Sequence, residues 1–500
     1  MLAWTIYLSF AGALIEALLP KSKPVLARGF ALAVAIAGLV LAVLGFAGMA
    51  GQGRFVIADV PWVPAMGIRY TLAADGISLV LVLLTGLAAI AGILFSWNID
   101  LRTNEFFAFY LALIGGVYGV FLSADLFLLF VFYEIAIVPK YFLIAIWGST
   151  RREYGAMKLA LYSFVGSAMV LIGLLAAYTT AGSRSTGLTE LAHAGLAPGF
   201  QMWAFPLVFV GFGILAGMWP FHTWAPTGHV AAPTAASMLL AGVVMKLGAY
   251  GCLRVAMGLF PRGMDPWGFS LIGIGSWRDV FALLAVIGIV YGALVALVQS
   301  DFKFVIGYSS VSHMGFVLLG LMTLNQIGLT GAVLQMFSHG IIAGLLFAIV
   351  GRVVYERTHT RQLAELEGMH LSKRLPFAAW AFVIAGTASM GLPGFSGFIA
   401  EFQVIVGSWR VNPWWTVATG VGIVIGVAYT WRALQKAFFG DGHAAAHVHE
   451  HGHELAAITW PEVAGVSMLV AASLFVGLYP RILLNAIEPA VRAMLAGGGQ

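Results

Sequence analysis

The sequence predicts an all-α protein that crosses a membrane many times. Hydrophobic residues make up 61% of its 500 residues, and charged residues only 9%. Apolar runs of about 18 to 25 residues recur along the chain, which is the length of a helix that spans the hydrocarbon core of a bilayer. Backbone polar groups in lipid need internal partners, and uninterrupted runs of this kind exclude a β-barrel. The composition therefore indicates a polytopic helical membrane protein.

Charge and cysteine content exclude several other classes of protein. The net charge of +5 comes from Lys and Arg residues that flank the apolar runs, which argues against nucleic-acid binding. The one cysteine, Cys252, lies inside an apolar run, so neither a disulfide framework nor thiol chemistry is expected. The N-terminal residues lack a basic region and a cleavage site, so they are expected to form a retained first helix.

Hydrophobic runs and turn residues predict about fourteen transmembrane helices. The expected ranges are 2–19, 25–49, 74–97, 105–122, 124–147, 156–180, 203–224, 232–259, 279–299, 303–324, 328–354, 376–409, 412–438 and 460–480. The β-branched, Pro-rich segment 50–73 predicts a short hairpin or an extended cover, with Asp75 as the cap of the next helix. The distribution of Lys and Arg between the loops, with Lys303 counted on the cytoplasmic side, places both termini outside.

Proline interrupts two of the expected helices. Met218-Trp219-Pro220 breaks the seventh, and the run Gly391–Gly397 breaks the twelfth. Freed backbone groups at membrane depth are tolerated only beside protein or water, so both breaks are expected near a hydrated path. Five spans separate the breaks, which predicts two inverted five-helix repeats, spans 4–8 and 9–13. The expected units are an N-terminal three-helix segment (1–104), two repeats (105–259 and 260–438), and a His-rich loop with a C-terminal helix (439–500).

Charged residues inside the apolar runs are the candidate functional site, since an ionisable group at this depth is costly and needs a partner or a wet cavity. Lys246 lies in the middle of the eighth span, where a lysine can serve as a proton store; a structural ion pair is the alternative. Glu134 lies deep in the fifth span, and desolvation and a nearby ammonium act on it in opposite directions. It is therefore a candidate proton carrier, with a permanently protonated glutamate as the alternative.

Lys140 is a further candidate on the same span as Glu134. It follows Glu134 by six residues, roughly 9 Å and 240° around an ideal helix, so the two are not expected to pair directly unless Pro139 bends the helix. The alternative for Lys140 is a side chain that snorkels toward the membrane interface.

Two histidines and a glutamate extend the set. His313 follows a run of serines in the tenth span, and His339 lies in the eleventh. An imidazole titrates near neutral pH and can relay protons, although a buried histidine often acts only as a hydrogen-bonding group. Glu401 follows the second break and is expected to exchange protons at one side of the membrane, as the second repeat's counterpart of Glu134 or Lys246. A cap or a surface position is its alternative.

The remaining histidines predict no metal site. His222 and His229 flank the loop after the first break with a spacing that does not match a zinc site, and they are expected to line a wet entrance. The histidines from His443 to His453 are expected to belong to a solvated cytoplasmic linker, with weak metal binding as the alternative.

Four stretches of the sequence resemble one known family. They are PFHTWAPTGHVAAPTAASMLLAGVVMKLGAYGCLR (220–254), QSDFKFVIGYSSVSHMGFVLLG (299–320), MFSHGIIAGLLF (336–347) and LPGFSGFIAEF (392–402). Together they resemble the antiporter-like subunits of respiratory complex I, the proton-pumping NADH–quinone oxidoreductase. The resemblance covers essentially the whole chain. Subunits of multisubunit Na⁺/H⁺ antiporters and of membrane-bound hydrogenases are near relatives of this family.

The resemblance implies roles for individual residues. Glu134, Lys246, His339 and Glu401 match the family's charged positions on spans 5, 8, 11 and 12. In the family the fifth-span glutamate pairs with a lysine of the broken seventh span, and here that position is Leu215.

Three interpretations of the absence of a lysine at position 215 are open. Lys140 supplies the missing charge, a lysine of a neighbouring subunit supplies it, or the subunit has lost coupled pumping. We favour Lys140.

The resemblance also implies a function and partners. The chain is expected to move protons through a series of Glu, Lys and His residues while redox chemistry proceeds in other subunits. No cofactor is expected in this chain; NADH, FMN, iron–sulfur clusters and quinone are expected in partner subunits. Other membrane-arm subunits, with L and N as neighbours, and the lipid of a bacterial inner membrane are the expected partners. A subunit of a multisubunit Na⁺/H⁺ antiporter or of a membrane-bound hydrogenase is the alternative.

Overall fold

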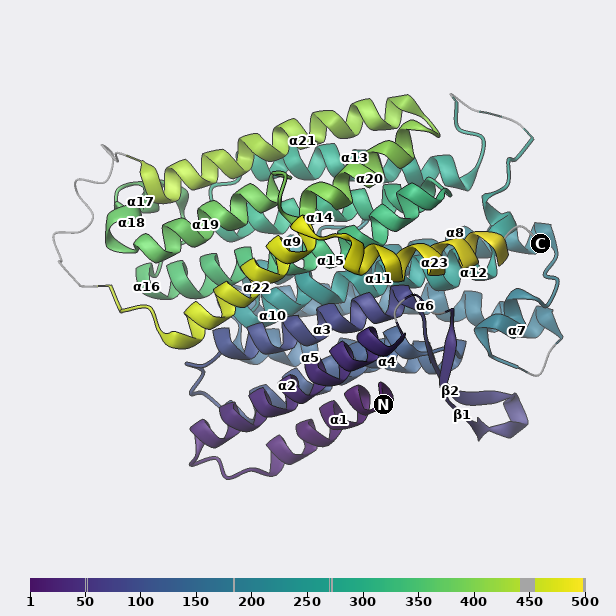
Figure 1. The fold of residues 1–500 in the computed structure, drawn as a ribbon, viewed down its shortest axis with the longest axis horizontal. Helices are drawn as coiled ribbons and strands as arrows, with labels where there is room; N and C mark the ends of the chain where they lie inside the picture. The colour runs from purple at the N-terminus through teal and green to yellow at the C-terminus, as the bar shows by residue number, and fades with distance from the viewer. Residues whose placement is uncertain are drawn as a thin grey trace.

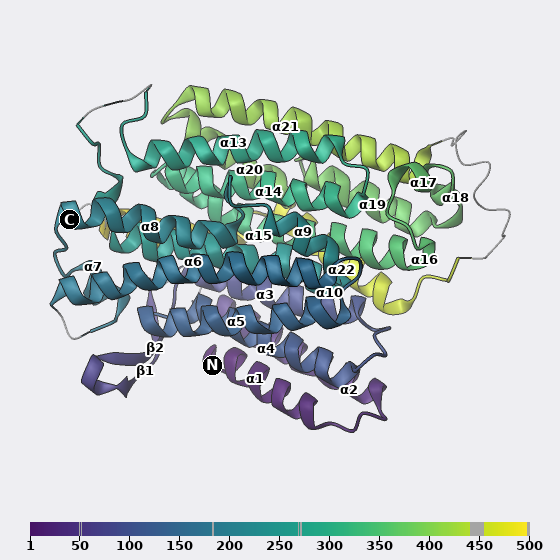
Figure 2. The same cartoon turned by 180° about the vertical axis from the view of Figure 1, so that it is seen from behind.

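The protein is a bundle of long, roughly parallel helices with a small β-hairpin at one end (Figures 1 and 2). The computed structural model describes residues 1–49, 51, 53–182, 185–268, 270, 273–440 and 455–497. In this part of the chain, twelve helices are long and apolar enough to cross a membrane, and two shorter apolar helices, α1 and α19, accompany them. The predicted all-α polytopic fold is confirmed.

The described chain consists of α-helices, two strands and short 3₁₀ and π-helical segments. The strands are β1 (Phe55–Val63) and β2 (Ile68–Ala74), 3₁₀ helices cover Pro64–Met66 and Pro261–Met264, and π-helical turns cover Leu240–Val244, Cys252–Ala256, Ile349–Tyr355 and Gln435–Phe439. The α-helices are α1 (Ala3–Leu18), α2 (Pro24–Met49), α3 (Gly76–Phe95), α4 (Thr103–Leu122), α5 (Leu126–Trp147), α6 (Arg152–Ala181), α7 (Leu188–Ala192), α8 (Pro198–Ala216), α9 (Trp224–Ala231), α10 (Thr234–Leu239), α11 (Met245–Gly251), α12 (Met257–Leu259), α13 (Trp277–Val298), α14 (Phe302–Met322), α15 (Gln326–Ala348), α16 (Glu356–Thr358), α17 (Leu363–Glu367), α18 (Leu371–Arg374), α19 (Pro376–Ser389), α20 (Ser396–Trp409), α21 (Pro413–Leu434), α22 (Trp460–Leu478) and α23 (Arg481–Gly497).

The predicted hairpin between the second and third spans is present. Strands β1 and β2 pair antiparallel, and Arg69 Nε lies 2.7 Å from Asp59 Oδ1 across them. Hydrogen bonds from Arg69 and Thr71 lower the pKa of the exposed Asp59 carboxyl. As predicted, Asp75 caps α3, accepting hydrogen bonds from two backbone N–H groups of its first turn, and it also forms an ion pair with Arg254.

Both predicted breaks are present. The seventh span consists of α8 and α9, separated at residues 217–223, and the twelfth consists of α19 and α20, separated at residues 390–395. Each break lies where proline and glycine prevent continuous helical hydrogen bonding. In Figure 1, α9 and α19 lie toward the bundle end that carries α16–α18, and α8 and α20 toward the hairpin end. We call these the inner and outer ends, because the excess of basic residues predicts the first to face the cytoplasm.

Several features of the first predicted repeat recur in the second with opposite direction. Asp125 caps α5, and Asp301 caps α14. Asp125 forms an isolated β-bridge with Gly187, directly before α7, and Asp301 forms one with Gln362, directly before α17. In both halves a broken span then follows. These shared features support the proposal of two inverted repeats.

The C-terminal region differs from the prediction of a single helix at 460–480. Two helices, α22 and α23, follow the His-rich segment, because Pro480 ends the apolar run. Leu483, Ala486, Ile487 and Ala490 are buried, and their spacing is that of one helical face. Helix α23 packs on α3 and α15. Sequence reasoning missed it because the helix is amphipathic and too polar to resemble a span.

Candidate functional site

The two most buried spans form the centre of the site. The composite spans Thr234–Leu259 and Gln326–Thr358 are each buried throughout their most apolar window. They approach closely at Gly242 and Gly340, where a Cβ on Gly340 would lie 2.6 Å from the Gly242 carbonyl oxygen. Only glycine permits this approach. It brings Lys246 of one span against His339 of the other.

Lys246 makes the central polar contact. Its Nζ lies 2.8 Å from His339 Nδ1 and also donates to the Ala241 carbonyl. Its side chain is fully buried. π-Helical turns lie on both sides of the α11 segment that carries it, and such turns, which often occur at functional sites, displace backbone carbonyls from the regular helical pattern. The Lys246 amine nitrogen is therefore held by one carbonyl and one imidazole in an apolar core.

A second group of contacts extends from His339 toward the outer half. The rings of His339 and His313 are stacked with centroids 5.4 Å apart. His313 Nδ1 lies 3.1 Å from Glu401 Oε1, and its Nε2 lies 3.3 Å from the Ser389 hydroxyl. Gln335 Nε2 lies 3.4 Å from both His313 and Glu401. A cavity of about 10 Å³ beside these residues has room for about one water molecule.

Four of the six predicted site residues therefore form one continuous line. Lys246, His339, His313 and Glu401 come from α11, α15, α14 and α20. The structure changes one detail of the prediction. Glu401 is not the positional counterpart of Glu134 or Lys246, because it lies on the half-helix after a break. It is the sixth residue of α20, and the sixth residue of α9 in the first repeat is His229.

Glu134 and Lys140 form a separate site on α5. As predicted, neither an ion pair nor a hydrogen bond joins the two within the described chain, although each is close enough to interact electrostatically with the other. Lys140 is 1% exposed, and its Nζ has no hydrogen-bond partner among the described residues. The snorkelling alternative for Lys140 is therefore wrong for this structure. Glu134 is only partly buried.

Other polar groups near this site also lack partners. The hydroxyl groups of Tyr133 and Ser163 are buried without a hydrogen-bond partner in the described part of the chain, and the Ser167 hydroxyl lies close to the Glu134 carboxyl. Helix α5 packs along α6, which carries both serines. Unpaired polar groups in an apolar interior are unfavourable. Such a cluster is a suitable place for water or for a group of a neighbouring subunit.

Leu215 lies where the family resemblance implies a seventh-span lysine. It is buried and lies near the end of α8, where a Cβ on Gly248 would lie 2.9 Å from its carbonyl carbon. Gly248 is two residues from Lys246. The ring of Tyr133 packs edge-on against Phe212, one turn before Leu215, with centroids 5.4 Å apart. Position 215 therefore lies between the α5 site and the span that carries Lys246.

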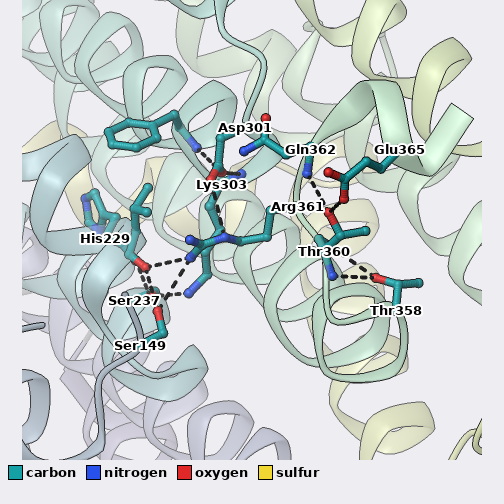
Figure 3. A network of polar contacts seen from close by, with 12 residues as sticks. Ser149, His229, Ser237, Asp301, Lys303, Thr358, Thr360, Arg361, Gln362 and Glu365 are labelled. Atoms are coloured by element: carbon teal, nitrogen blue, oxygen red, sulfur yellow. Dashed lines mark hydrogen bonds and ion pairs between the residues drawn. The ribbon is translucent and has the colours of Figure 1, made fainter. Parts of the chain in front are cut away.

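A third polar cluster lies at the inner end (Figure 3). Lys303 Nζ donates to the Ala232 carbonyl at 2.9 Å and lies 3.5 Å from the Ser237 hydroxyl. Beside it, Arg361 pairs with Asp301 at 3.3 Å. The Ser237 hydroxyl in turn donates to the His229 carbonyl at 2.7 Å.

From the sequence, Lys303 was counted among the basic residues of the cytoplasmic side, and its burial was not predicted. Its side chain is buried. The sequence feature that could have indicated this burial is Asp301. It lies two residues before Lys303 and caps α14, so it fixes the start of the helix and directs Lys303 into the bundle. His222 and His229 are also buried, and neither ring has a hydrogen-bond partner among the described residues.

Two further regions are relevant to metal or ligand binding. The segment from His443 to His453 lies outside the described residues, and in the described ranges no group of three His, Cys, Asp or Glu residues could hold a metal ion. A cavity of about 780 Å³ opens at the outer end and is lined by Asp75, Tyr250 and Arg254 among others; the six predicted site residues are not among its described lining residues.

Comparison with known proteins places the chain in a family. Residues 123–426 match the family described as NADH:quinone oxidoreductase/Mrp antiporter, TM. The chain belongs to this family. It is 36% identical to the NADH-quinone oxidoreductase subunit M of Rhodobacter capsulatus, over 93% of this chain and 90% of that protein. It is 35% identical to the NAD(P)H-quinone oxidoreductase chain 4 1 of Synechococcus elongatus, over 98% of this chain and 90% of the relative.

Solved structures share the fold of this chain. A chain of respiratory complex I from Thermus thermophilus superposes with a TM-score of 0.88 at 26% identity, with both chains covered completely. A chain of the Mrp complex from Dietzia shares the fold, with a TM-score of 0.82 at 21% identity over 99% of this chain and 97% of that one.

Proposed function

We propose that this family member is subunit M of a complex I-type NADH–quinone oxidoreductase and that it translocates protons without carrying electrons. The observation that carries this proposal is the buried line from Lys246 through His339 and His313 to Glu401. We place the chain in a bacterial inner membrane with both termini outside and with subunits L and N as neighbours. NADH, FMN, iron–sulfur clusters and quinone belong, in this proposal, to partner subunits.

The line can move a proton because each neighbouring group alternates between two protonation states. A protonated Lys246 donates to His339 across 2.8 Å, and the two stacked imidazoles pass the proton to Glu401, whose carboxylate accepts it from His313. A charge about 4 Å away changes a group's energy by roughly 4 kcal/mol at an effective dielectric near 20. An energy change of this size shifts a protonation equilibrium about a thousandfold, which is enough to protonate or deprotonate a lysine near neutral pH.

Glu134 and Lys140 are proposed to couple this line to events in the neighbouring subunit. Glu134 is partly exposed on the isolated subunit, and Lys140 is buried six residues away without a partner in the described chain. A charge that reaches Glu134 from outside the subunit would therefore act first on Lys140. In this proposal Lys140 replaces the lysine that the family resemblance implies at the position of Leu215.

The assignment to a redox-driven complex is tested by purification of the full assembly. A tag on the C-terminus and a mild detergent should recover a large complex that contains flavin, absorbs as iron–sulfur clusters do, and reduces quinone with NADH. A redox-silent assembly of membrane subunits alone would contradict the proposal and favour a multisubunit Na⁺/H⁺ antiporter, the alternative consistent with the shared Mrp fold.

A further inference from the structure

The cavity at the outer end plays no part in the line from Lys246 to Glu401. Its volume is about 780 Å³, which is within the range of sites that bind small molecules. Helices α7, α12 and α23 contribute to its lining at the end of the bundle that carries the hairpin (Figure 1). We propose that the cavity binds one phospholipid, with the phosphate on Arg54 and Arg278 and an acyl chain against α12 and α23.

The cavity lies at the level where membrane-spanning helices begin. Its lining includes Asp75 and Ser78, at the start of α3, and Ser276, the cap of α13. The headgroups of a bilayer lie directly outside its hydrocarbon core. A phospholipid of the leaflet at this end therefore has its phosphate and the start of its acyl chains at the depth of the cavity.

Two arginines of the lining form no ion pair with a described residue. Arg54 donates to the Thr189 hydroxyl at 2.9 Å, and Arg278 donates to the Met322 and Thr323 carbonyls at 2.7 and 3.1 Å. A guanidinium group offers five N–H donors in a fork that fits the oxygens of a phosphate. Both arginines therefore have positive charge and unused donors to offer to an anionic group.

The carboxylates of the lining already have partners within the chain. Asp75 caps α3 and pairs with Arg254. Asp279 accepts hydrogen bonds at the start of α13. Asp265 lies 3.1 Å from Arg262 Nε. The charge that is left to bind a ligand is therefore the positive charge of the two arginines.

Apolar side chains form much of the remaining lining. They include Met257 and Leu259 of α12 and Met494 and Leu495 of α23. Met494 and Leu495 are only half-buried, and covering apolar surface of this kind is favourable. A free phosphate ion would leave these side chains uncovered, whereas an acyl chain covers them. The combination of arginines and apolar side chains therefore favours a phospholipid.

Gly258 adjoins open space in the cavity that it lines. Beyond its own helical turn, a Cβ on Gly258 would meet no atom of the described chain closer than 3.9 Å. A larger side chain at this position therefore occupies the cavity and leaves its arginines unchanged. This glycine allows the space and the charge of the cavity to be tested separately.

The test is photo-crosslinking of the intact complex, purified in a mild detergent. The probe is a phosphatidylglycerol with a diazirine in one acyl chain, and its control is a diacylglycerol with the same chains but no phosphate. Labelled peptides are identified by mass spectrometry. We expect the phospholipid to label the peptides that contain Met257 and Met494. The diacylglycerol should label them about tenfold less, because hydrogen bonds between charged groups contribute about this factor to affinity.

Two changes in the chain are expected to remove the labelling. The double variant Arg54→Gln/Arg278→Gln should lower it about tenfold by removing the partners of the phosphate, and Gly258→Leu should abolish it by filling the space. The controls are Arg492→Gln, at an exposed position of α23 outside the lining, and Gly420→Leu, at a glycine of α21 with open surroundings. Both controls should be labelled like the unmodified complex.

Full labelling of the assembled double variant would overturn the inference. If that variant fails to assemble, Gly258→Leu decides in the same way. Equal labelling by the diacylglycerol would also overturn it, and displacement of the probe by millimolar inorganic phosphate would assign the arginines to a free phosphate ion instead. Absence of labelling in the unmodified complex would contradict the inference and indicate that a neighbouring subunit fills the space. The readout is independent of proton pumping, so this inference and the proposed function can fail separately.

Discussion

Replacing Lys140 by Met is expected to abolish proton pumping, and adding Leu215→Lys in the same chain is expected to restore it. Lys140 is buried without a partner in the described chain, and Leu215 occupies the position at which relatives are expected to carry the lysine. Across roughly 9 Å two unit charges interact by about 2 kcal/mol at an effective dielectric near 20. Loss of Lys140 removes this interaction with Glu134, which corresponds to about a 30-fold change in an equilibrium.

The double variant tests whether a lysine at position 215 on α8 can take over the role of Lys140 on α5. Position 215 lies beside Gly248, close to the span that carries Lys246, so a lysine there can act on the same line of groups. The readout is NADH-driven proton uptake in vesicles, normalised to the amount of assembled complex. Lys158→Met serves as the control, since Lys158 is partly exposed on α6 and should be replaceable. Unchanged pumping by Lys140→Met would remove Lys140 from the mechanism.

Replacing Glu401 by Gln is expected to reduce pumping at least tenfold by blocking proton release. Glutamine has nearly the same shape and can still contact His313, which lies 3.1 Å from the carboxylate, but it cannot accept a proton at neutral pH. Glu401→Asp keeps a titratable group on a shorter side chain and should retain part of the activity. A merely structural hydrogen bond would instead favour Gln over Asp.

The control for Glu401 is a carboxylate outside the line of charges. Glu367 forms a partly exposed ion pair with Lys436 at 3.1 Å, and such pairs contribute little. Glu367→Gln should therefore pump like the unmodified complex. A Glu401→Gln complex that pumps at the full rate would show that protons leave the subunit by another route.

The sequence predicted the features that are encoded locally. Apolar runs, proline breaks and isolated charges are visible without any knowledge of tertiary contacts, and the fold and the two breaks were predicted from them. Asp75 and Asp125 cap their helices because short acidic side chains satisfy free N–H groups at helix starts.

Contacts between distant segments could not be predicted in the same way. Lys246 and His339 are 93 residues apart, and their contact depends on the close approach of Gly242 and Gly340. Lys303 resembles a surface lysine in sequence because it lies at the start of a span. Only the packing of α9 against α14 shows that it is buried.

The most direct test of the account compares the rates of proton uptake and quinone reduction, and the ratio of protons moved to electrons transferred, in sealed vesicles of the unmodified complex and of Lys246→Met. Lys246 is fully buried at the start of the line, and methionine is similar in length but cannot carry a proton. The account predicts a complex of normal composition in which both proton uptake and quinone reduction coupled to it fall, while NADH oxidation by a soluble artificial acceptor is unchanged. An assembled Lys246→Met complex with the same rate and the same ratio as the unmodified complex would contradict the claim that this subunit moves protons through Lys246.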